Sequence, residues 1–173
     1  MDFVIVANAW SAVRNNPTSK HQIALELVRK GHRVLWMEGA GMRRPSLGST
    51  ADRGKIVRKI RSAFRGVRAV DPGRLWVLAP LTVPLPSSRC VRAFNGWLYG
   101  VAARRAAARL GFRNPVLINY VPVLSEAMRG WRKRTQAGRT DGTRHRTVYH
   151  CVDRWEKFNM YDAEMMRAAD AAC

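Results

Sequence analysis

The first 38 residues constrain the fold more than any other part of the chain. Phe3 to Ala7 is an uninterrupted apolar run, which is typical of a strand buried on both faces of a parallel sheet. A helix is expected to start near Asn16 to Ser19 and to end at Gly31, and His32 to Met37 predicts a second strand. This β-α-β unit predicts an α/β fold with a doubly wound, mostly parallel, Rossmann-like sheet and helices on both faces.

The same alternation continues along the chain. We expect strands at Leu75 to Leu78, Val116 to Asn119 and Thr147 to Val152, and helices at Cys90 to Leu110, which Gly111 ends, and at Tyr161 to Ala172. The 173 residues, 47% of them apolar, suffice for one domain with a core. Because no strand follows the last helix, we expect residues 1–173 to be a single N-terminal domain that is cut short.

Two segments depart from the alternation. Asp52 to Arg68 places apolar residues on one helical face and basic residues on the others, which predicts a basic amphipathic helix inserted into the domain. Trp131 to Arg146 is polar and basic and contains two glycines, which predicts a flexible loop.

Basic charge is concentrated in the middle of the chain. Residues 39–152 carry 23 of the 31 basic residues and four of the 12 acidic ones, and the net charge of the chain is +19. Arginine suits phosphate and carboxylate partners, although a genome biased toward arginine explains the same composition. The basic helix either contacts an anionic membrane surface or is a solvated helix packed on the domain. The residues expected to make the membrane contact are Lys55, Arg58, Lys59, Arg61 and Arg65.

The termini and cysteines bear on the compartment. The N-terminal apolar run has no basic leader, and no run reaches the ~18 apolar residues of a membrane span, so we expect a cytoplasmic protein, with the inner membrane face as a possible peripheral location. Cys90, Cys151 and Cys173 are odd in number and far apart, which argues against a disulfide framework and a zinc ribbon. Free, mostly buried thiols are expected.

The first strand-to-helix turn excludes two nucleotide-binding classes. Asn8 to Asn16 contains no glycine, whereas dinucleotide cradles need Gly-x-Gly-x-x-Gly, and the chain has no P-loop. Ligands of such sheets nevertheless bind outside the carboxyl ends of the strands, where this turn lies. The first helix either holds an anion at its start, with Lys20 adding positive charge, or is simply capped there. His21, in its first turn, either faces the crevice or packs inside the domain. The candidate ligand-binding residues of this turn and helix start are Trp10, Asn15, Asn16, Thr18 and His21.

Two further strand ends carry candidate residues. Glu38 ends the second strand and is expected either to contact sugar hydroxyls or to act as a cap or ion-pair partner. His150 and Asp153 end the last strand, where a catalytic base is expected, and Trp155 is available to stack on a sugar ring. We expect no metal site, because alternate residues of one strand point to opposite faces.

Three segments together resemble the N-terminal half of bacterial glycosyltransferases of the GT-B fold, of the group 1 or family four type. They are Asn16 to His21, Gly31 to Gly39 and Tyr149 to Trp155, and the similarity covers most of the chain in order. The resemblance implies an enzyme with two Rossmann-like lobes, in which this lobe binds the acceptor and a C-terminal lobe, absent here and expected beyond Cys173, binds the donor.

The resemblance also implies a reaction. A glycosyl group would pass from a nucleotide-diphosphate sugar to a hydroxyl of a polysaccharide or glycolipid acceptor, with His150 and Asp153 near the reacting hydroxyl, and with no cofactor in this chain. The alternative is a non-catalytic basic module that binds phosphate-rich partners, either an anionic membrane surface or nucleic acid. No nucleic-acid motif supports the nucleic-acid version.

Overall fold

A computed structural model describes residues 1–39, 66–83, 88–124, 131, 146–151 and 163–171. The strands of the described chain are β1 (Asp2–Ala7), β2 (Arg33–Glu38), β3 (Arg68–Asp71), β4 (Leu75–Leu78), β5 (Val116–Asn119) and β6 (Thr147–Tyr149). The α-helices are α1 (Ser19–Arg29), α3 (Arg89–Arg109) and α5 (Ala163–Ala171), and two short 3-10 helices are η1 (Trp10–Val13) and η2 (Pro122–Leu124).

In the described part of the chain, the strands form one six-stranded sheet in the order β3-β4-β2-β1-β5-β6. The pairs β4-β2, β2-β1, β1-β5 and β5-β6 are parallel, and β3 alone is antiparallel to its neighbour. After β1 the chain builds the sheet outward through β2 and β4, and then returns to the other side of β1 with β5. This confirms the predicted α/β fold with a mostly parallel sheet.

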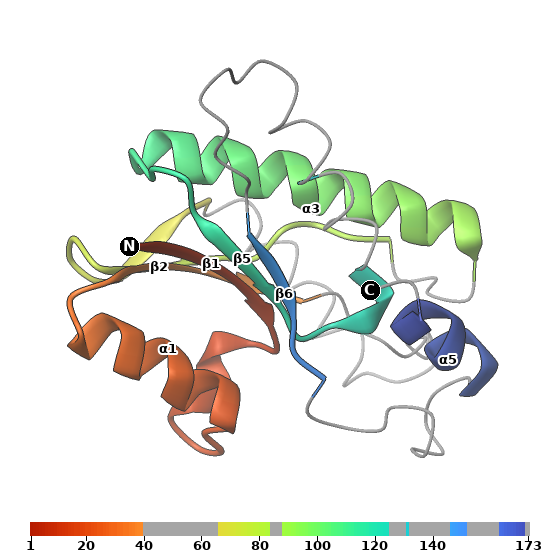
Figure 1. Ribbon diagram of the computed structural model, residues 1–173, viewed down its shortest axis with the longest axis horizontal. Coiled ribbons are helices and arrows are strands. Elements are labelled where there is room, and N and C mark those ends of the chain that lie inside the picture. Colours follow the sequence, from red (N-terminus) through yellow and green to blue (C-terminus); the bar gives the residue numbers. More distant parts are fainter. Residues whose placement is uncertain (40–65, 84–87, 125–130, 132–145, 152–162, 172–173) are drawn as a thin grey trace, which may run out of the picture.

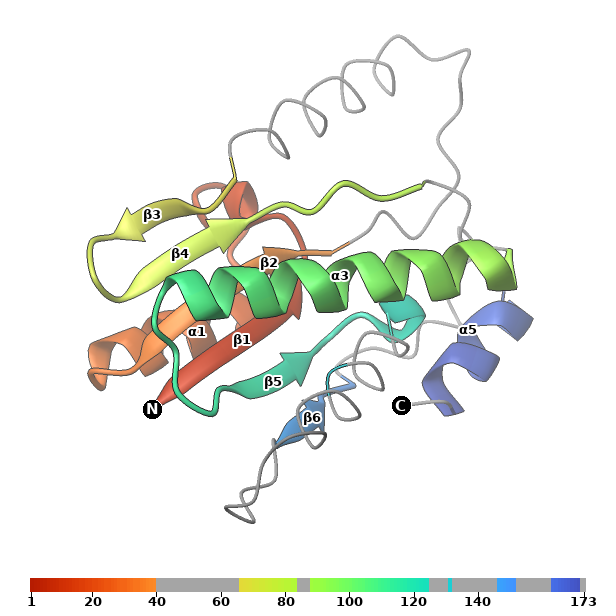
Figure 2. The same cartoon turned by 90° about the horizontal axis from the view of Figure 1, so that it is seen from above.

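Helices cover both faces of the sheet. Figure 1 shows α1 below the sheet and α3 above it, and Figure 2 shows α3 running across the strands from the other view. Strand residues alternate between the two layers: Val4 and Val6 pack in the cluster on the α3 side, whereas Ile5 and Ala7 pack in the cluster on the α1 side. Strands buried on both faces explain the uninterrupted apolar run that the sequence carries there.

The long helix α3 fits closely on the sheet because its buried face is made largely of small residues. Ala103, Ala106 and Ala107 are all at most 5% exposed and pack in the cluster on the α3 side. Ser88 caps the start of the helix, since its side chain accepts a hydrogen bond from the Val91 N–H at 3.4 Å. Gly111 follows the last turn with φ +63°, as the sequence predicts for a helix end.

The region around β3 corrects one prediction. The basic helix was expected to run to Arg68, but Gly66 has φ +64° and Arg68 begins β3, which pairs with β4. Gly73, with φ +82°, lies in the turn between these two strands. All four β3 residues are exposed, so the strand has no apolar pattern that would predict it. Residues 40–65, which hold the rest of the expected helix and its five membrane-contact candidates, lie outside the described residues.

Three smaller expectations are also corrected. Trp131 was placed in a polar loop but is 2% exposed and packs in the core cluster on the α3 side. The thiols of Cys90 and Cys151 are exposed and not buried. The last strand ends at Tyr149, short of the predicted Val152, which lies outside the described residues.

Candidate functional site

The carboxyl edge of the sheet gathers polar residues from four neighbouring parallel strands. Asn8 follows β1, Glu38 ends β2, Asn119 ends β5 with Tyr120 directly after it, and His150 follows β6. Since β2 and β5 flank β1, the direction in which the sheet is built reverses at β1. Ligands of open α/β sheets bind in the crevice at such a reversal, so this edge is the candidate site.

The side chain of Asn8 at this edge has a hydrogen-bond acceptor that no described residue uses. Its Oδ1 is buried and has no hydrogen-bond partner within the described part of the protein. Its backbone carbonyl accepts a hydrogen bond from the Trp36 Nε1–H at 2.9 Å, which holds the chain in place where it leaves β1. An orphaned buried acceptor costs roughly 1–3 kcal/mol, so a ligand donor that reaches Oδ1 would recover this free energy.

The Glu38 carboxylate is used as a cap. Its Oε1 accepts a hydrogen bond from the Trp10 N–H, at 3.0 Å, at the first residue of η1. Its backbone carbonyl accepts from the Tyr99 hydroxyl of α3. Burial, together with the Glu38 charge, raises the pKa of Tyr99, so this phenol remains a donor. Glu38 was expected either to contact sugar hydroxyls or to act as a cap or ion-pair partner, and the structure shows a capping contact. The residue is half-buried at the edge of the sheet.

Two of the predicted acceptor-binding residues are core residues. Trp10 is 5% exposed and meets the ring of Trp36 edge-on, with centroids 5.0 Å apart. His21 is fully buried and stacks on Trp36, with centroids 4.9 Å apart and an interplanar angle of 16°. Neither ring has a surface left for a sugar, so the packed interpretation of His21 holds and the ligand-facing placement of Trp10 is wrong.

The hydrogen bonds of His21 define its proton state. Its Nδ1 accepts from the Thr18 backbone N–H at 3.1 Å, so the ring proton sits on Nε2, which faces the Ala9 carbonyl oxygen at 3.3 Å. Burial lowers the pKa of His21, the contact with Ala9 opposes this, and the Lys20 charge adds to the lowering. His21 therefore closes the start of α1 as a neutral capping-box partner of Thr18.

The other predicted residues of the first turn lie around this capped helix start. Asn15 and Asn16 are exposed, and Thr18 is half-buried. Lys20 is 8% exposed, and its Nζ lies 5.9 Å from the ring centroid of Tyr120. Asn15, Asn16 and Thr18 are therefore open to a ligand in different degrees, and Lys20 brings a positive charge to the end of β5.

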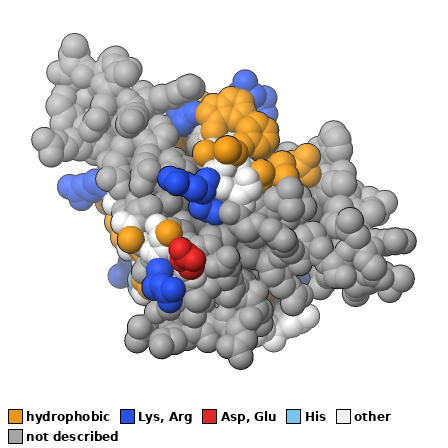
Figure 3. All heavy atoms as spheres, turned by 90° about the vertical axis from the view of Figure 1, so that its right-hand side faces the viewer, with side chains coloured by type: hydrophobic (Ala, Val, Ile, Leu, Met, Phe, Trp, Pro, Cys, Tyr) orange, Lys and Arg blue, Asp and Glu red, His pale blue; other side chains and the backbone are white. Residues whose placement is uncertain are grey.

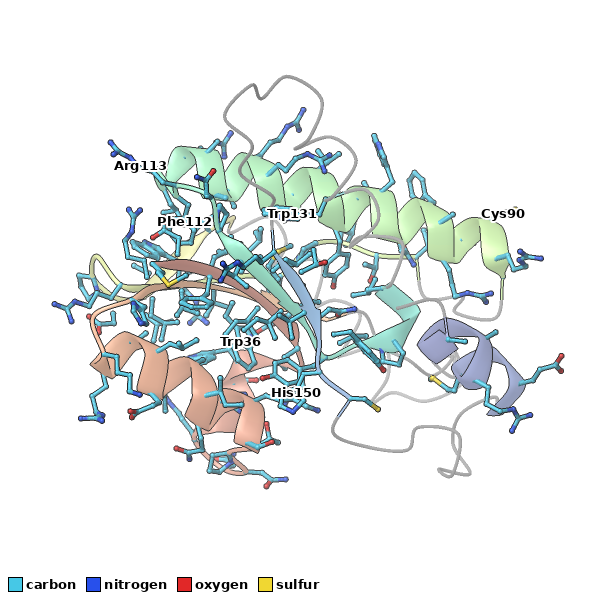
Figure 4. The ribbon with its side chains drawn as sticks, in the orientation of Figure 1. Trp36, Cys90, Phe112, Arg113, Trp131 and His150 are labelled. Atoms are coloured by element: carbon cyan, nitrogen blue, oxygen red, sulfur yellow. The ribbon has the colours of Figure 1, made fainter. Side chains whose placement is uncertain are left out.

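His150 and Tyr120 form a pair that the sequence did not single out. His150 is exposed at the end of β6, on the side of the sheet that faces α1 (Figure 4). Its Nδ1 lies 3.3 Å from the Tyr120 hydroxyl, and the two ring centroids are 5.0 Å apart. Tyr120 was missed because its relation to His150 depends on the pairing of β5 with β6. Asp153 and Trp155, the other candidates of this segment, lie outside the described residues.

A second surface feature lies on α3. Phe94 and Trp97 are 48% and 51% exposed and stack on each other, with ring centroids 5.9 Å apart. The helix carries five arginines and no acidic residue. Figure 3 shows hydrophobic side chains gathered on the face that holds the first turns of α3, with basic side chains beside them. We call Phe94, Trp97 and Arg89, which lies in the first turn of the same helix, the α3 aromatic patch.

No helix among the described residues is long and apolar enough to cross a membrane. Comparison with known proteins identifies no family: no protein-family model, no curated protein and no solved structure matches this chain.

Proposed function

We propose that the chain is the acceptor-binding lobe of a GT-B glycosyltransferase, which passes a glycosyl group from a nucleotide-diphosphate sugar to a hydroxyl of a polysaccharide or glycolipid acceptor. In this reaction the acceptor oxygen bonds to the anomeric carbon, the bond from that carbon to the diphosphate breaks, and the hydroxyl proton goes to a base. The sequence assigns proton transfer to Asp153 and His150. The three segments that resemble the family supply the proposal, and the carboxyl edge of the sheet supplies a site for it.

The observation that carries the proposal is the buried Oδ1 of Asn8 at the reversal point of the sheet, which has no hydrogen-bond partner among the residues that the structure describes. Such an oxygen can only accept a hydrogen bond, and sugar hydroxyls are donors of the right kind. The exposed Asn15 and Asn16 lie on the chain that follows, where further hydroxyl contacts are available. Because Trp10 is buried, the proposal does not include it among the acceptor contacts.

Glycoside binding tests this function on the chain as it is. Saturation-transfer NMR with a panel of methyl pyranosides of glucose, galactose, mannose and N-acetylglucosamine would show which sugar the edge binds. Asn8→Ala should weaken binding roughly five-fold, the factor that corresponds to one net hydrogen bond. Gln22→Ala is the matched control, because Gln22 is an exposed amide on α1. If no glycoside binds, or if Asn8→Ala binds like the native chain, the acceptor site is not here.

The α3 aromatic patch favours a second function, a basic module that binds an anionic membrane surface. Exposed tryptophan and phenylalanine side chains on an arginine-rich helix suit the headgroup layer of a membrane, in which rings can insert and cations meet anionic lipids. Each cation near the surface contributes about 1 kcal/mol to the free energy of membrane binding. Sedimentation with vesicles that contain one-third phosphatidylserine should capture the native chain, and Phe94→Ser with Trp97→Ser should remove this capture. Capture by pure phosphatidylcholine vesicles, or unchanged capture of the double variant, would reject the patch. Binding of duplex DNA in its place would select the nucleic-acid alternative.

A further inference from the structure

We propose that Tyr120 is a positioning residue that holds His150 as its Nε2–H tautomer, so that His150 meets a ligand as a hydrogen-bond donor and not as a base. The ligand part of this inference rests on the proposed function, whereas the tautomer part rests only on the two side chains. Tyr120 follows β5 and His150 follows β6, so the pairing of these strands brings the two residues together.

Tyr120 is held rigidly. Its backbone N–H donates to the Val6 carbonyl of β1 at 2.9 Å, and its ring is 1% exposed within the cluster on the α1 side. His150 is held through its own backbone, because its N–H donates to the Asn119 carbonyl at 3.0 Å. The backbones of both residues are therefore fixed by the sheet, which sets the distance between the positions from which the two side chains extend.

The direction of the hydrogen bond between the rings follows from burial. A buried hydroxyl needs an acceptor for its proton, and the acceptor within reach of the Tyr120 hydroxyl among the described residues is Nδ1 of His150, at 3.3 Å. Burial raises the pKa of Tyr120, so the phenol keeps its proton. The Lys20 ammonium near the ring also draws electron density from the phenol, which favours its role as donor. The hydroxyl therefore donates and Nδ1 accepts.

This direction decides which nitrogen carries the proton. A neutral imidazole has one N–H, so a ring whose Nδ1 accepts must carry its proton on Nε2. His150 is exposed, so this N–H is open to the oxygen of a ligand at the carboxyl edge. The neutral ring then has no free lone pair with which to remove the proton of an acceptor hydroxyl. That step passes to a carboxylate, for which Asp153 is the candidate in the sequence.

The tautomer is measured directly by long-range ¹H–¹⁵N correlation spectra of the histidine-labelled chain at a pH where the rings are neutral. We expect His150 to show the Nε2–H pattern. In Tyr120→Phe, the ratio of Nε2–H to Nδ1–H forms should fall roughly five-fold, because one net hydrogen bond is lost. The signals of His32, which lies at the opposite end of the sheet beside Met1, should not change and serve as the control within the same spectrum.

Two results would overturn the inference: an Nδ1–H pattern for His150 in the native chain, or the same tautomer ratio in the native chain and in Tyr120→Phe. The first needs no variant, so it decides the matter even if Tyr120→Phe does not fold. No ligand is present in either measurement. A failure of glycoside binding with the expected tautomer would therefore count against the proposed function alone.

Discussion

The guanidinium of Arg33 binds both carboxylate oxygens of Asp2, with Nε 2.8 Å from Oδ1 and Nη2 2.7 Å from Oδ2. The same guanidinium donates to the carbonyls of Leu110 at 3.2 Å and Gly111 at 3.0 Å. The Arg113 backbone N–H donates to Asp2 as well. This arrangement ties the amino ends of β1 and β2 to the turn between α3 and β5, at the edge opposite the candidate site.

Arg33→Ala should therefore lower the free energy of unfolding by about 2–3 kcal/mol, because Asp2 would be left buried with a charge and without its bidentate partner. Urea denaturation followed by circular dichroism measures the change. Arg29→Ala is the matched control: Arg29 makes the same two-point contact with Glu26, but on the exposed side of α1. We expect no measurable change there. Equal effects of the two substitutions would contradict the structural role of Asp2.

The buried His21 predicts a pH dependence of stability. Its pKa in the folded chain lies below 6.5, so the unfolded chain binds the proton more readily. The free energy of unfolding should fall as the pH drops below about 6.5, and this loss should end once the pH passes the lowered folded pKa. Denaturation at pH 7.5, 6.5 and 5.5 would show this slope, and His21→Gln should reduce it.

His32→Gln is the control for that measurement, since it also removes one histidine but lies at the surface beside Met1 and Phe3. If His32→Gln reduces the slope as much as His21→Gln does, the slope does not come from the buried ring.

Gly39 lies where the chain after β2 passes close to the end of β1. A Cβ at this position would lie 2.8 Å from the Ala7 carbonyl oxygen and 2.9 Å from Cγ2 of Val121. Gly39→Ala should lower the free energy of unfolding by about 2 kcal/mol, since a backbone atom cannot move aside as a side chain can. In Gly73→Ala, the added Cβ meets nothing within 4 Å, and only the positive φ of +82° adds a cost of about 1 kcal/mol. A smaller loss in Gly39→Ala than in Gly73→Ala, by thermal denaturation, would refute the close approach.

Asn8→Ala should weaken glycoside binding without weakening the fold. The substitution removes a buried acceptor, Oδ1, that no described residue satisfies. We expect the free energy of unfolding to stay equal or to rise by up to about 1 kcal/mol, as happens where a binding site is maintained at the expense of stability. Asn119→Ala provides the contrast. The Asn119 Nδ2 donates to the Val121 carbonyl and its Oδ1 accepts from the Val121 N–H, at 3.0 Å each, so the loss of this side chain should destabilise the chain. A large loss of stability in Asn8→Ala would mean that Oδ1 has a structural partner.

The strands and helices that the sequence predicted well share a local signal. β1, β2, β4 and β5 are short apolar runs, and α1 and α3 begin at capping residues and end at glycines with positive φ. The elements that were missed have no such signal. β3 is exposed along its whole length, and it is a strand because it pairs with β4. Trp131 lies in a polar stretch but is buried in a core cluster that also contains residues of α3 and η2.

The sequence by itself determined the α/β class, the parallel central strands and the edge at which polar residues follow them, because hydrophobic periodicity and caps act over a few neighbouring residues. Only the tertiary structure decided what those residues do. It packed Trp10 edge-on against Trp36, stacked His21 on the same ring, used Glu38 as a cap and paired Tyr120 with His150, and it left Oδ1 of Asn8 without a hydrogen-bond partner among the described residues. Each of these contacts joins residues from different elements, and the order of the strands in the sheet, which no local pattern encodes, brings them together.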